Sequence, residues 1–302
     1  MTVSILVVDD ENRCAKRSLV RLLLFFAIAM ASWLAAEKVQ AGGLIEFPNV
    51  EQGSPAQLPA YLARPDQGLP AYLGGRAASA SAPYPAVVVL HGCSGFSSYN
   101  TNFADQIASW GYVVLAIDSL SPRGIASRCS RPGAGPLLEQ ALDAYAALRY
   151  LSRLDFVDPE RVAVLGGSMG GFSALRVVGH ELVTQHSERQ FRAAIAYYPL
   201  CRAPQTVKAP TLILIGELDD TTPAQDCQAM VENSRPEGAP ISLTVYPGTY
   251  HAFDVAQLDP GIQTLGHRYE YNRSAATDAE TKVRAFLVEN LAKPDSARPA
   301  TR

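Results

Sequence analysis

The sequence predicts an α/β fold, in which a mostly parallel sheet carries helices on both faces. Short apolar runs alternate with segments of helical spacing, and this alternation indicates strand-helix-strand units. The chain has 302 residues, 48% of them hydrophobic and only 18% charged, so it can bury a large core. No linker divides residues 44–293, and we therefore expect a single domain over residues 42–302.

The expected strands are apolar runs bounded by Gly, Pro or polar residues. Residues 86–90 are apolar throughout, which is typical of a strand buried on both faces of a sheet. Residues 137–154 carry apolar side chains close to helical spacing, which predicts a long helix. Strands are expected at residues 44–47, 60–63, 86–90, 112–117, 161–165, 193–198, 211–215 and 241–246, and helices at residues 103–110, 137–154, 168–178, 224–233 and 275–291.

Residues 1–41 predict an N-terminal extension with a signal peptide. Basic residues at positions 13, 16, 17 and 21 precede an uncharged apolar run at residues 22–36, and cleavage is expected between Ala41 and Gly42. The run of 15 residues is shorter than the ~20 that a membrane-spanning helix needs, so we expect no membrane span after cleavage. The sequence therefore predicts a protein exported to the periplasm or secreted.

The predicted mature chain has an even number of cysteines: Cys93, Cys129, Cys201 and Cys227. In an exported protein this favours at least one disulfide. Four cysteines allow three pairings, and the sequence does not choose between them. Sequential pairing would join Cys93 to Cys129 and Cys201 to Cys227, and would tie together loops that leave neighbouring strands.

The strongest chemical signal is the pattern G-x-S-x-G at residues 166–170, which follows an expected strand and opens an expected helix. Such a tight turn exposes the serine hydroxyl, here of Ser168, at the carboxyl end of the strand. The helix N-terminus favours negative charge that develops nearby. The structural alternative is a glycine-rich turn with a capping serine.

Two later loops, each after an expected strand, carry a candidate acid and a candidate base. Asp219 follows the strand at 211–215, with Asp220 and Glu217 as competing acids, and His251 follows the strand at 241–246. A serine hydroxyl is a weak nucleophile until a base takes its proton, and histidine titrates near neutrality. A carboxylate would hold the histidine tautomer and stabilise the imidazolium.

An acyl-transfer site also needs donors for the developing oxyanion. The backbone N–H of Met169 supplies one, and the turn after the strand at 86–90 should supply a second, from Cys93 or alternatively from Ser94. Arg123, which follows a strand, is a candidate contact for an anionic substrate or else a loop ion-pair partner. Tyr250, beside His251, is a further candidate substrate contact.

Several classes of function are disfavoured. The formal net charge is only −3, so the chain has no electrostatic footprint for nucleic acid. Metal binding is disfavoured because neither H-E-x-x-H nor paired C-x-x-C spacing occurs. Nucleotide chemistry is unsupported because no G-x-G-x-x-G or Walker lysine motif is present.

Taken together, His91-Gly92, the turn at Ser168, Gly216-x-x-Asp219-x-x-x-Pro223 and His251-Ala252-Phe253 resemble the motifs of the dienelactone hydrolase family of α/β-hydrolases, over about residues 44–292. The resemblance implies an α/β-hydrolase fold, no cofactor, and hydrolysis of a small ester or lactone through an acyl-enzyme. It also implies that Asp219, rather than Asp220, is the acid of a Ser168-Asp219-His251 triad.

The sequence departs from this family at three positions. Ser168 stands where dienelactone hydrolases proper carry cysteine, Gly92 stands in place of a glutamate, and Val255 stands in place of an arginine that holds a substrate carboxylate. These departures argue against dienelactone itself as the substrate. Three other functions stay open. They are a serine peptidase of the prolyl-oligopeptidase type, although no propeller-sized region is present, acyl transfer to a sugar or alcohol, and a catalytically silent binding protein on the same fold.

Overall fold

The computed structural model describes residues 42–49, 55–65, 83–129, 138–186, 188–202 and 206–292. All of them belong to one compact unit, Ala41–Arg302. The predicted extension and signal peptide, residues 1–41, lie outside the described residues. No described helix has both the length and the apolar character needed to cross a membrane.

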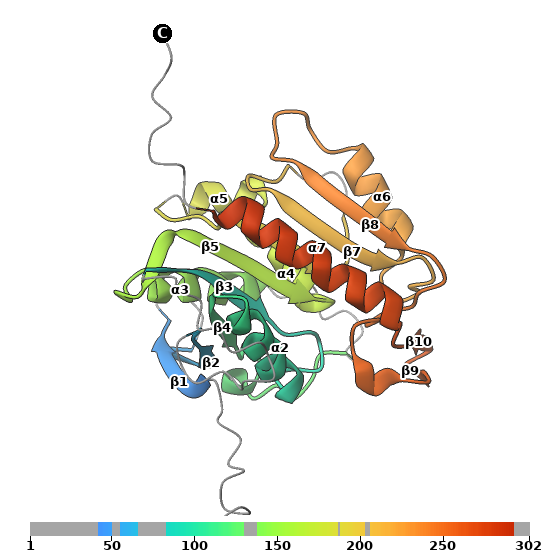
Figure 1. The fold of residues 1–302 in the computed structure, drawn as a ribbon, viewed down its shortest axis with the longest axis horizontal. Coiled ribbons are helices and arrows are strands. Elements are labelled where there is room, and N and C mark those ends of the chain that lie inside the picture. The colour runs from blue at the N-terminus through green and yellow to red at the C-terminus, as the bar shows by residue number, and fades with distance from the viewer. Residues whose placement is uncertain are drawn as a thin grey trace, which may run out of the picture. The chain divides into compact units, whose positions relative to one another are not determined.

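A mostly parallel sheet of eight strands forms the centre of the fold (Figure 1), which confirms the predicted fold class. Its strands are β1 (Gly42–Pro48), β2 (Gln57–Ala63), β3 (Tyr84–Leu90), β4 (Val113–Ile117), β5 (Val157–Gly167), β6 (Ala193–Tyr197), β7 (Thr211–Gly216) and β8 (Ile241–Tyr246). They lie in the order β1-β2-β4-β3-β5-β6-β7-β8. Strand β2 runs antiparallel to both β1 and β4, and every other neighbouring pair in this sheet is parallel. The carboxyl ends of β3 to β8 therefore meet at one edge of the sheet.

Helices cover both faces of the sheet. They are α2 (Ser98–Ser109), α3 (Leu138–Leu151), α4 (Met169–Val177), α5 (His180–Gln185), α6 (Ala224–Glu232) and α7 (Arg273–Leu291), with the short 3-10 helices η2 (Ser121–Arg123) and η3 (Ala256–Leu258). A separate hairpin, β9 (Ile262–Thr264) with β10 (His267–Tyr269), lies between η3 and α7. The sequence predicted the five longer helices, but it predicted neither α5 nor the hairpin.

Alternate side chains of each central strand pack into different cores. In β3, Val87 and Val89 pack with apolar side chains of α2 and α7, whereas Ala86, Val88 and Leu90 pack with those of α3 and α4. Figure 1 shows α7 in front of the strands, with α3 and α4 behind them. Burial on both faces explains why β3 is apolar at every position after Tyr84 and Pro85.

Two disulfides cross-link segments that follow the strands, one between two loops and one between a loop and helix α6. Cys93, after β3, is bonded to Cys129, in the loop that follows β4. Cys201, after β6, is bonded to Cys227 in α6. These are the sequential pairings.

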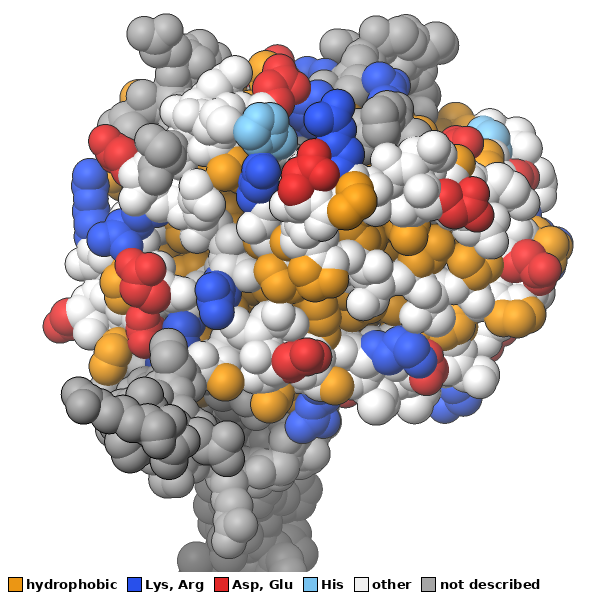
Figure 2. Space-filling view, turned by 90° about the horizontal axis from the view of Figure 1, so that it is seen from above, with side chains coloured by type: hydrophobic (Ala, Val, Ile, Leu, Met, Phe, Trp, Pro, Cys, Tyr) orange, Lys and Arg blue, Asp and Glu red, His pale blue; other side chains and the backbone are white. Residues whose placement is uncertain are grey.

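On the face in Figure 2, acidic and basic side chains are interspersed, and hydrophobic side chains gather toward the middle.

Candidate active site

Ser168 occupies the single position between β5 and α4, in a turn that only glycine neighbours permit. Its backbone has φ 56° and ψ −116°, an uncommon conformation for a residue with a side chain, which costs about 1–3 kcal/mol. A Cβ on Gly166 would lie 2.3 Å from the carbonyl of Gly170. A Cβ on Gly170 would lie 2.3 Å from the carbonyl oxygen of Leu90. The two glycines therefore let β5, α4 and the end of β3 meet around the serine.

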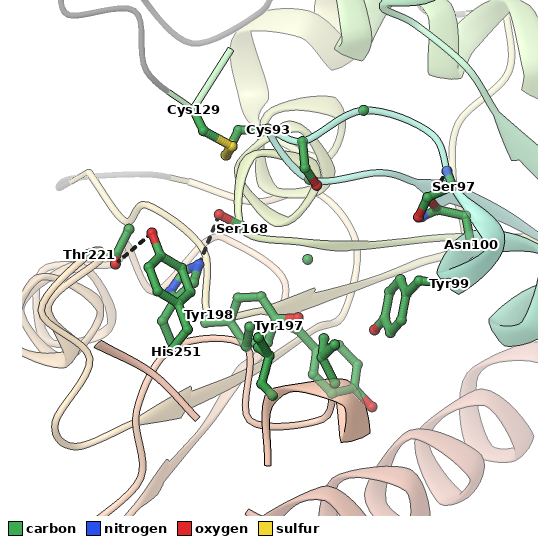
Figure 3. Close-up of a pocket in the computed structure, with 18 of the residues that line it drawn as sticks. Cys93, Ser97, Tyr99, Asn100, Cys129, Ser168, Tyr197, Tyr198, Thr221 and His251 are labelled. Carbon is green, nitrogen blue, oxygen red and sulfur yellow. Dashed lines mark hydrogen bonds between the residues drawn. A yellow bond between two sulfur atoms is a disulfide. The ribbon is translucent and has the colours of Figure 1, made fainter. Parts of the chain in front are cut away.

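The structure brings together the three residues that the sequence singled out. The His251 Nε2 atom lies 3.0 Å from the Ser168 Oγ, and the His251 Nδ1 atom lies 2.7 Å from the Asp219 Oδ2. His251 and Asp219 are buried, with exposed fractions of 2% and 3%. Figure 3 shows the Ser168 hydroxyl joined to the histidine ring. This arrangement can pass a proton from the serine hydroxyl to a histidine that a carboxylate orients.

The loop after β7 fixes the orientation of the Asp219 carboxylate. Its Oδ1 accepts hydrogen bonds from the backbone N–H groups of Thr221 (3.0 Å) and Thr222 (2.8 Å). Its Oδ2 accepts a further bond of 3.0 Å from the Thr222 hydroxyl. The two competing acids lie elsewhere: Asp220 pairs with His267, and Glu217 accepts from the backbone N–H of Gly248.

The turn that carries Cys93 lies beside Ser168. A Cβ on Gly92 would be 3.8 Å from the Ser168 Cβ, so the next N–H, that of Cys93, is near the nucleophile. Within the described part of the chain, neither the Cys93 N–H nor the Met169 N–H donates to a protein acceptor. Met169 is the first residue of α4, where backbone N–H groups lack partners inside the helix. Both groups are free to bind an oxyanion.

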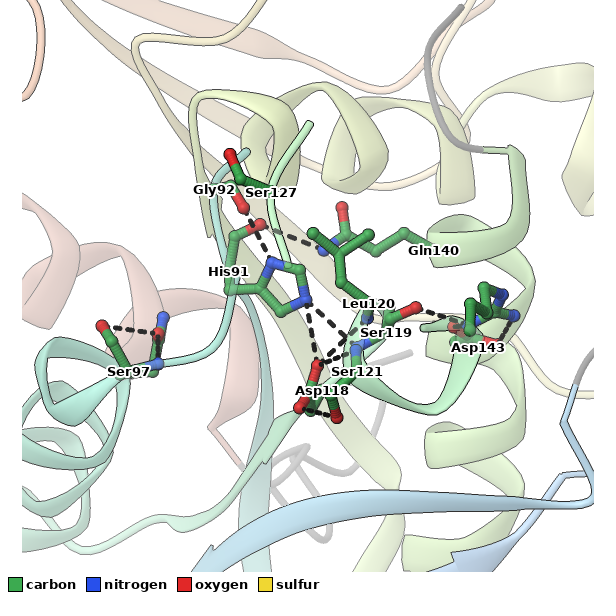
Figure 4. Close-up of polar contacts among 12 residues, drawn as sticks. His91, Gly92, Ser97, Asp118, Ser119, Leu120, Ser121, Ser127, Gln140 and Asp143 are labelled. Atoms are coloured by element: carbon green, nitrogen blue, oxygen red, sulfur yellow. Dashed lines mark hydrogen bonds and ion pairs between the residues drawn. The ribbon is translucent and has the colours of Figure 1, made fainter. Parts of the chain in front are cut away.

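His91 supports this turn as a neutral, buried residue. Its Nε2 accepts from the backbone N–H of Ser119 (3.1 Å), so Nδ1 carries the proton and donates to the Gly92 carbonyl oxygen at 2.8 Å. Burial lowers the pKa of His91. The His91 carbonyl oxygen accepts from Gln140, a fully buried side chain that is itself bonded to Ser173. Figure 4 shows the bonds that join His91 to Gly92, Ser119 and Gln140. Through Gln140 and Ser173 the turn is joined to α3 and α4.

The structure places Arg123 and Tyr250 away from the cavity. The Arg123 guanidinium donates to both carboxylate oxygens of the buried Asp143, at 2.8 and 2.9 Å, and to the Ser119 carbonyl oxygen. Its charge is therefore neutralised inside the protein. Tyr250 packs under the Arg268 guanidinium, which lies 5.1 Å from the ring centroid. Neither residue lines the cavity at Ser168.

A cavity of about 380 Å³ opens at Ser168, within the range of about 300–1,000 Å³ that small-molecule sites have. None of the described side chains that line it is an Asp, Glu, Lys or Arg. One wall comes from α2 and the residues before it, and the other from the segment between His251 and α7. The side chains that line the cavity include Tyr99, Phe103, Tyr198, Val255, Leu258, Ile262, Leu265 and Tyr269. Apart from Val255, these residues were not singled out in the sequence, because each becomes part of the site only through long-range packing.

Two tyrosines that line the cavity share one carboxylate. The hydroxyls of Tyr99 and Tyr198 donate to the two oxygens of Asp254. Burial raises the pKa of Asp254, and the two hydrogen bonds oppose this effect. The Tyr198 ring centroid lies 4.6 Å from that of His251. The histidine is therefore held by Asp219 at one nitrogen and by the anchored Tyr198 ring beside it.

Within the described ranges, no three His, Cys, Asp or Glu side chains are grouped so that they could hold a metal ion. The arrangement at Ser168 combines a serine hydroxyl, a histidine, a carboxylate and backbone N–H groups beside a cavity whose described lining has no Asp, Glu, Lys or Arg. These are the groups that acyl transfer would require.

Known proteins are similar to this chain in sequence and in fold. The model of the dienelactone hydrolase family matches residues 69–291. A cutinase of Thermobifida alba, est1, is 28% identical over 205 residues, which are 68% of this chain and 64% of the cutinase. A dienelactone hydrolase-like promiscuous phosphotriesterase from metagenomic libraries has a TM-score of 0.64 at 16% identity, covering 83% of this chain and 99% of that one. Esterase 2 of Thermogutta terrifontis has a TM-score of 0.58 at 20% identity, covering 85% and 98%. The chain belongs to the dienelactone hydrolase family and is a carboxylic ester hydrolase with the α/β-hydrolase fold.

Proposed function

We propose that the protein hydrolyses a small carboxylic ester or lactone through an acyl-enzyme formed on Ser168. The observation that carries this proposal is the continuous set of hydrogen bonds from Ser168 through His251 to Asp219, at the cavity. Each of the three residues comes from a different loop at the carboxyl edge of the sheet. If His251 were only a surface residue and Asp219 only a turn former, neither would need to be buried and hydrogen-bonded in this set.

Acylation uses these three residues in turn. The Ser168 Oγ attacks the ester carbonyl carbon while the His251 Nε2 takes the hydroxyl proton. Asp219 accepts a hydrogen bond from the Nδ1–H of His251 and stabilises the imidazolium that forms. When the tetrahedral intermediate collapses, the bond to the leaving oxygen breaks, and His251 returns the proton to the departing alcohol.

The backbone N–H groups of Cys93 and Met169 stabilise the negative charge on the carbonyl oxygen in this step. A donor of this kind typically contributes about 3 kcal/mol to the transition state. Water then attacks the acyl-enzyme, His251 takes a proton from that water, and Ser168 leaves with the proton returned. The products are a carboxylic acid and the free enzyme.

A comparison of the wild-type protein with its Ser168→Ala variant tests the proposal. We expect hydrolysis of p-nitrophenyl butyrate to fall at least ~10³-fold in the variant, because the nucleophile is absent. The wild-type protein should also be inactivated by a fluorophosphonate, with the adduct found on Ser168 by mass spectrometry. Equal rates in both proteins would refute the mechanism. Faster cleavage of peptide anilides than of esters would support the peptidase alternative, and no reaction with ester, anilide or fluorophosphonate would support the binding protein.

We propose further that the protein acts outside the cytoplasm, as a periplasmic or secreted enzyme. The two disulfides of the described chain support this location, because such bonds persist in oxidising compartments. Immunoblots of cell fractions test it. Recovery of the protein in the cytoplasm, with its N-terminal 41 residues still attached, would refute it.

A further inference from the structure

The hairpin formed by β9 and β10 lines one side of the cavity with Ile262, Thr264, Leu265 and Tyr269. It is attached to the catalytic loop through Tyr269, which forms a β-bridge with His251 and whose ring lies 5.4 Å from the histidine ring. Ile262 and Leu265 of the hairpin line the cavity, as does Leu258 just before it. The hairpin is therefore positioned to contact any ester that reaches Ser168.

Ile262 and Leu265 are exposed although they are large and apolar. Their exposed fractions are 47% and 54%. Large apolar side chains on a surface are common when they are scattered singly, and need no explanation there. These two, however, are continuous with the uncharged cavity that holds the candidate nucleophile. A ligand in that cavity would remove them from water.

The backbone at Leu265 is a second, independent observation. Thr264 pairs with His267, so Leu265 and Gly266 are the two central residues of the turn. Both have positive φ, 55° and 84°. Two-residue hairpin turns with positive φ at both positions favour Asn-Gly or Asp-Gly, because a bulky side chain is strained there. Leucine is thus a poor residue for the turn, and a strained residue beside a site suggests a role in binding.

We propose that Ile262 and Leu265 extend the cavity into a binding surface for an uncharged apolar chain of the ester substrate. The inference rests on the proposed function and names the substrate class of the same site. The apolar side chains would gain burial as the ester chain lengthens. A charged group on that chain would find no counter-ion among the described lining residues, and would lose its hydration without compensation.

The test compares chain-length preference in the wild-type protein and in two variants chosen to preserve the hairpin. Leu265→Asn places a residue that favours the turn, and Ile262→Thr keeps a β-branched side chain in the strand. Leu44→Ser, at another exposed leucine (76%) far from the cavity on β1, is the matched control. Melting temperatures show whether each variant folds.

Two substrate series are needed, because the apolar chain could belong to the acid or to the alcohol. They are p-nitrophenyl acetate, butyrate and octanoate, followed by absorbance, and ethyl, butyl and octyl acetate, followed by acid release. Burial of one methylene is worth about fourfold in kcat/KM, so the loss of contact with about two methylenes predicts about a 15-fold drop in the octyl-to-short-chain ratio of kcat/KM. We expect this drop in at least one series for Leu265→Asn and for Ile262→Thr, and no change for Leu44→Ser.

A third comparison tests the absence of charge. The wild-type protein should prefer p-nitrophenyl hexanoate to the p-nitrophenyl monoester of adipic acid by at least about tenfold. Equal rates on these two esters, or chain-length ratios unchanged in both hairpin variants, would overturn the inference. If Ser168→Ala abolishes activity while the hairpin variants behave like the wild type, the inference fails and the proposed function stands. Equal activity of wild type and Ser168→Ala would overturn both.

Discussion

Replacement of Asp219 by Asn tests the role of the acid at the level of single protons. The Oδ1 position accepts from two backbone N–H groups, those of Thr221 and Thr222, so the amide oxygen of the variant must occupy it. The NH₂ group then replaces Oδ2 and faces the His251 Nδ1 across 2.7 Å. Because an amide NH₂ can only donate, Nδ1 must give up its proton, and the neutral ring carries that proton on Nε2.

A proton on Nε2 leaves His251 unable to act as the base. The Nε2 atom is 3.0 Å from the Ser168 Oγ and is the only ring atom in reach of it. The imidazolium that forms during acylation would also lack a carboxylate partner. A wrong tautomer of this kind lowers kcat by about 10⁴-fold, or roughly 5 kcal/mol. The fold should be retained, because the amide oxygen keeps both backbone hydrogen bonds.

The assay is the steady-state hydrolysis of p-nitrophenyl butyrate at pH 7.5, with thermal unfolding as the check on folding. Asp220→Asn is the matched control, because Asp220 is the adjacent residue, is half exposed and pairs with His267 rather than His251. We expect this control to keep at least half of the wild-type kcat. A folded Asp219→Asn protein with more than a tenth of the wild-type kcat would refute the reasoning, as would an equal loss in Asp220→Asn.

Two further predictions concern the supports of the site. Replacing Cys93 and Cys129 by Ser removes a cross-link across 36 residues, which should lower the free energy of unfolding by roughly 4 kcal/mol and reduce kcat, because Cys93 carries an oxyanion donor. The Cys201→Ser, Cys227→Ser protein, without a cross-link across 26 residues, should lose similar stability in urea titrations and keep its kcat; equal kcat values in the two proteins would contradict this. Because burial lowers the pKa of His91, the unfolded chain binds a proton at higher pH than the folded protein does. The stability due to neutral His91 is therefore complete above its ordinary pKa of 6.5 and is lost as the pH falls toward the lowered value. Between pH 7.5 and 5, His91→Gln should lose less stability than the wild type, and identical losses would show that His91 does not contribute.

The strands were predictable because burial on both faces excludes polar residues from them. All six residues of β7 are buried, and the four between Thr211 and Gly216 are all apolar. Helix ends were less predictable. Helix α2 begins at Ser98, five positions before the predicted start, because Ser97 and Asn100 form a capping box that the apolar spacing does not reveal.

The proximity of Ser168, Asp219 and His251 could be predicted because parallel strands bring their carboxyl ends to one edge. Other parts of the site left no local pattern. The bond between Tyr198 and Asp254 joins residues 56 positions apart. The ion pair between Arg123 and Asp143 could not be predicted either, because Asp143 lies 20 positions away on α3. The three-residue strands β9 and β10 are too short for an alternation of polar and apolar residues to stand out.

The turn after β3 is held more firmly than its length requires, and the proposed chemistry explains why. Its position is fixed by the disulfide from Cys93, by the side-chain bonds of His91 and by the bond from Gln140 to the His91 carbonyl oxygen. Backbone donors stabilise an oxyanion strongly only when they are already in place, since reorganisation during the reaction would cancel the gain. In the proposed mechanism, the buried polar side chains of His91 and Gln140 would therefore act on the reaction indirectly, by fixing the Cys93 N–H where negative charge develops.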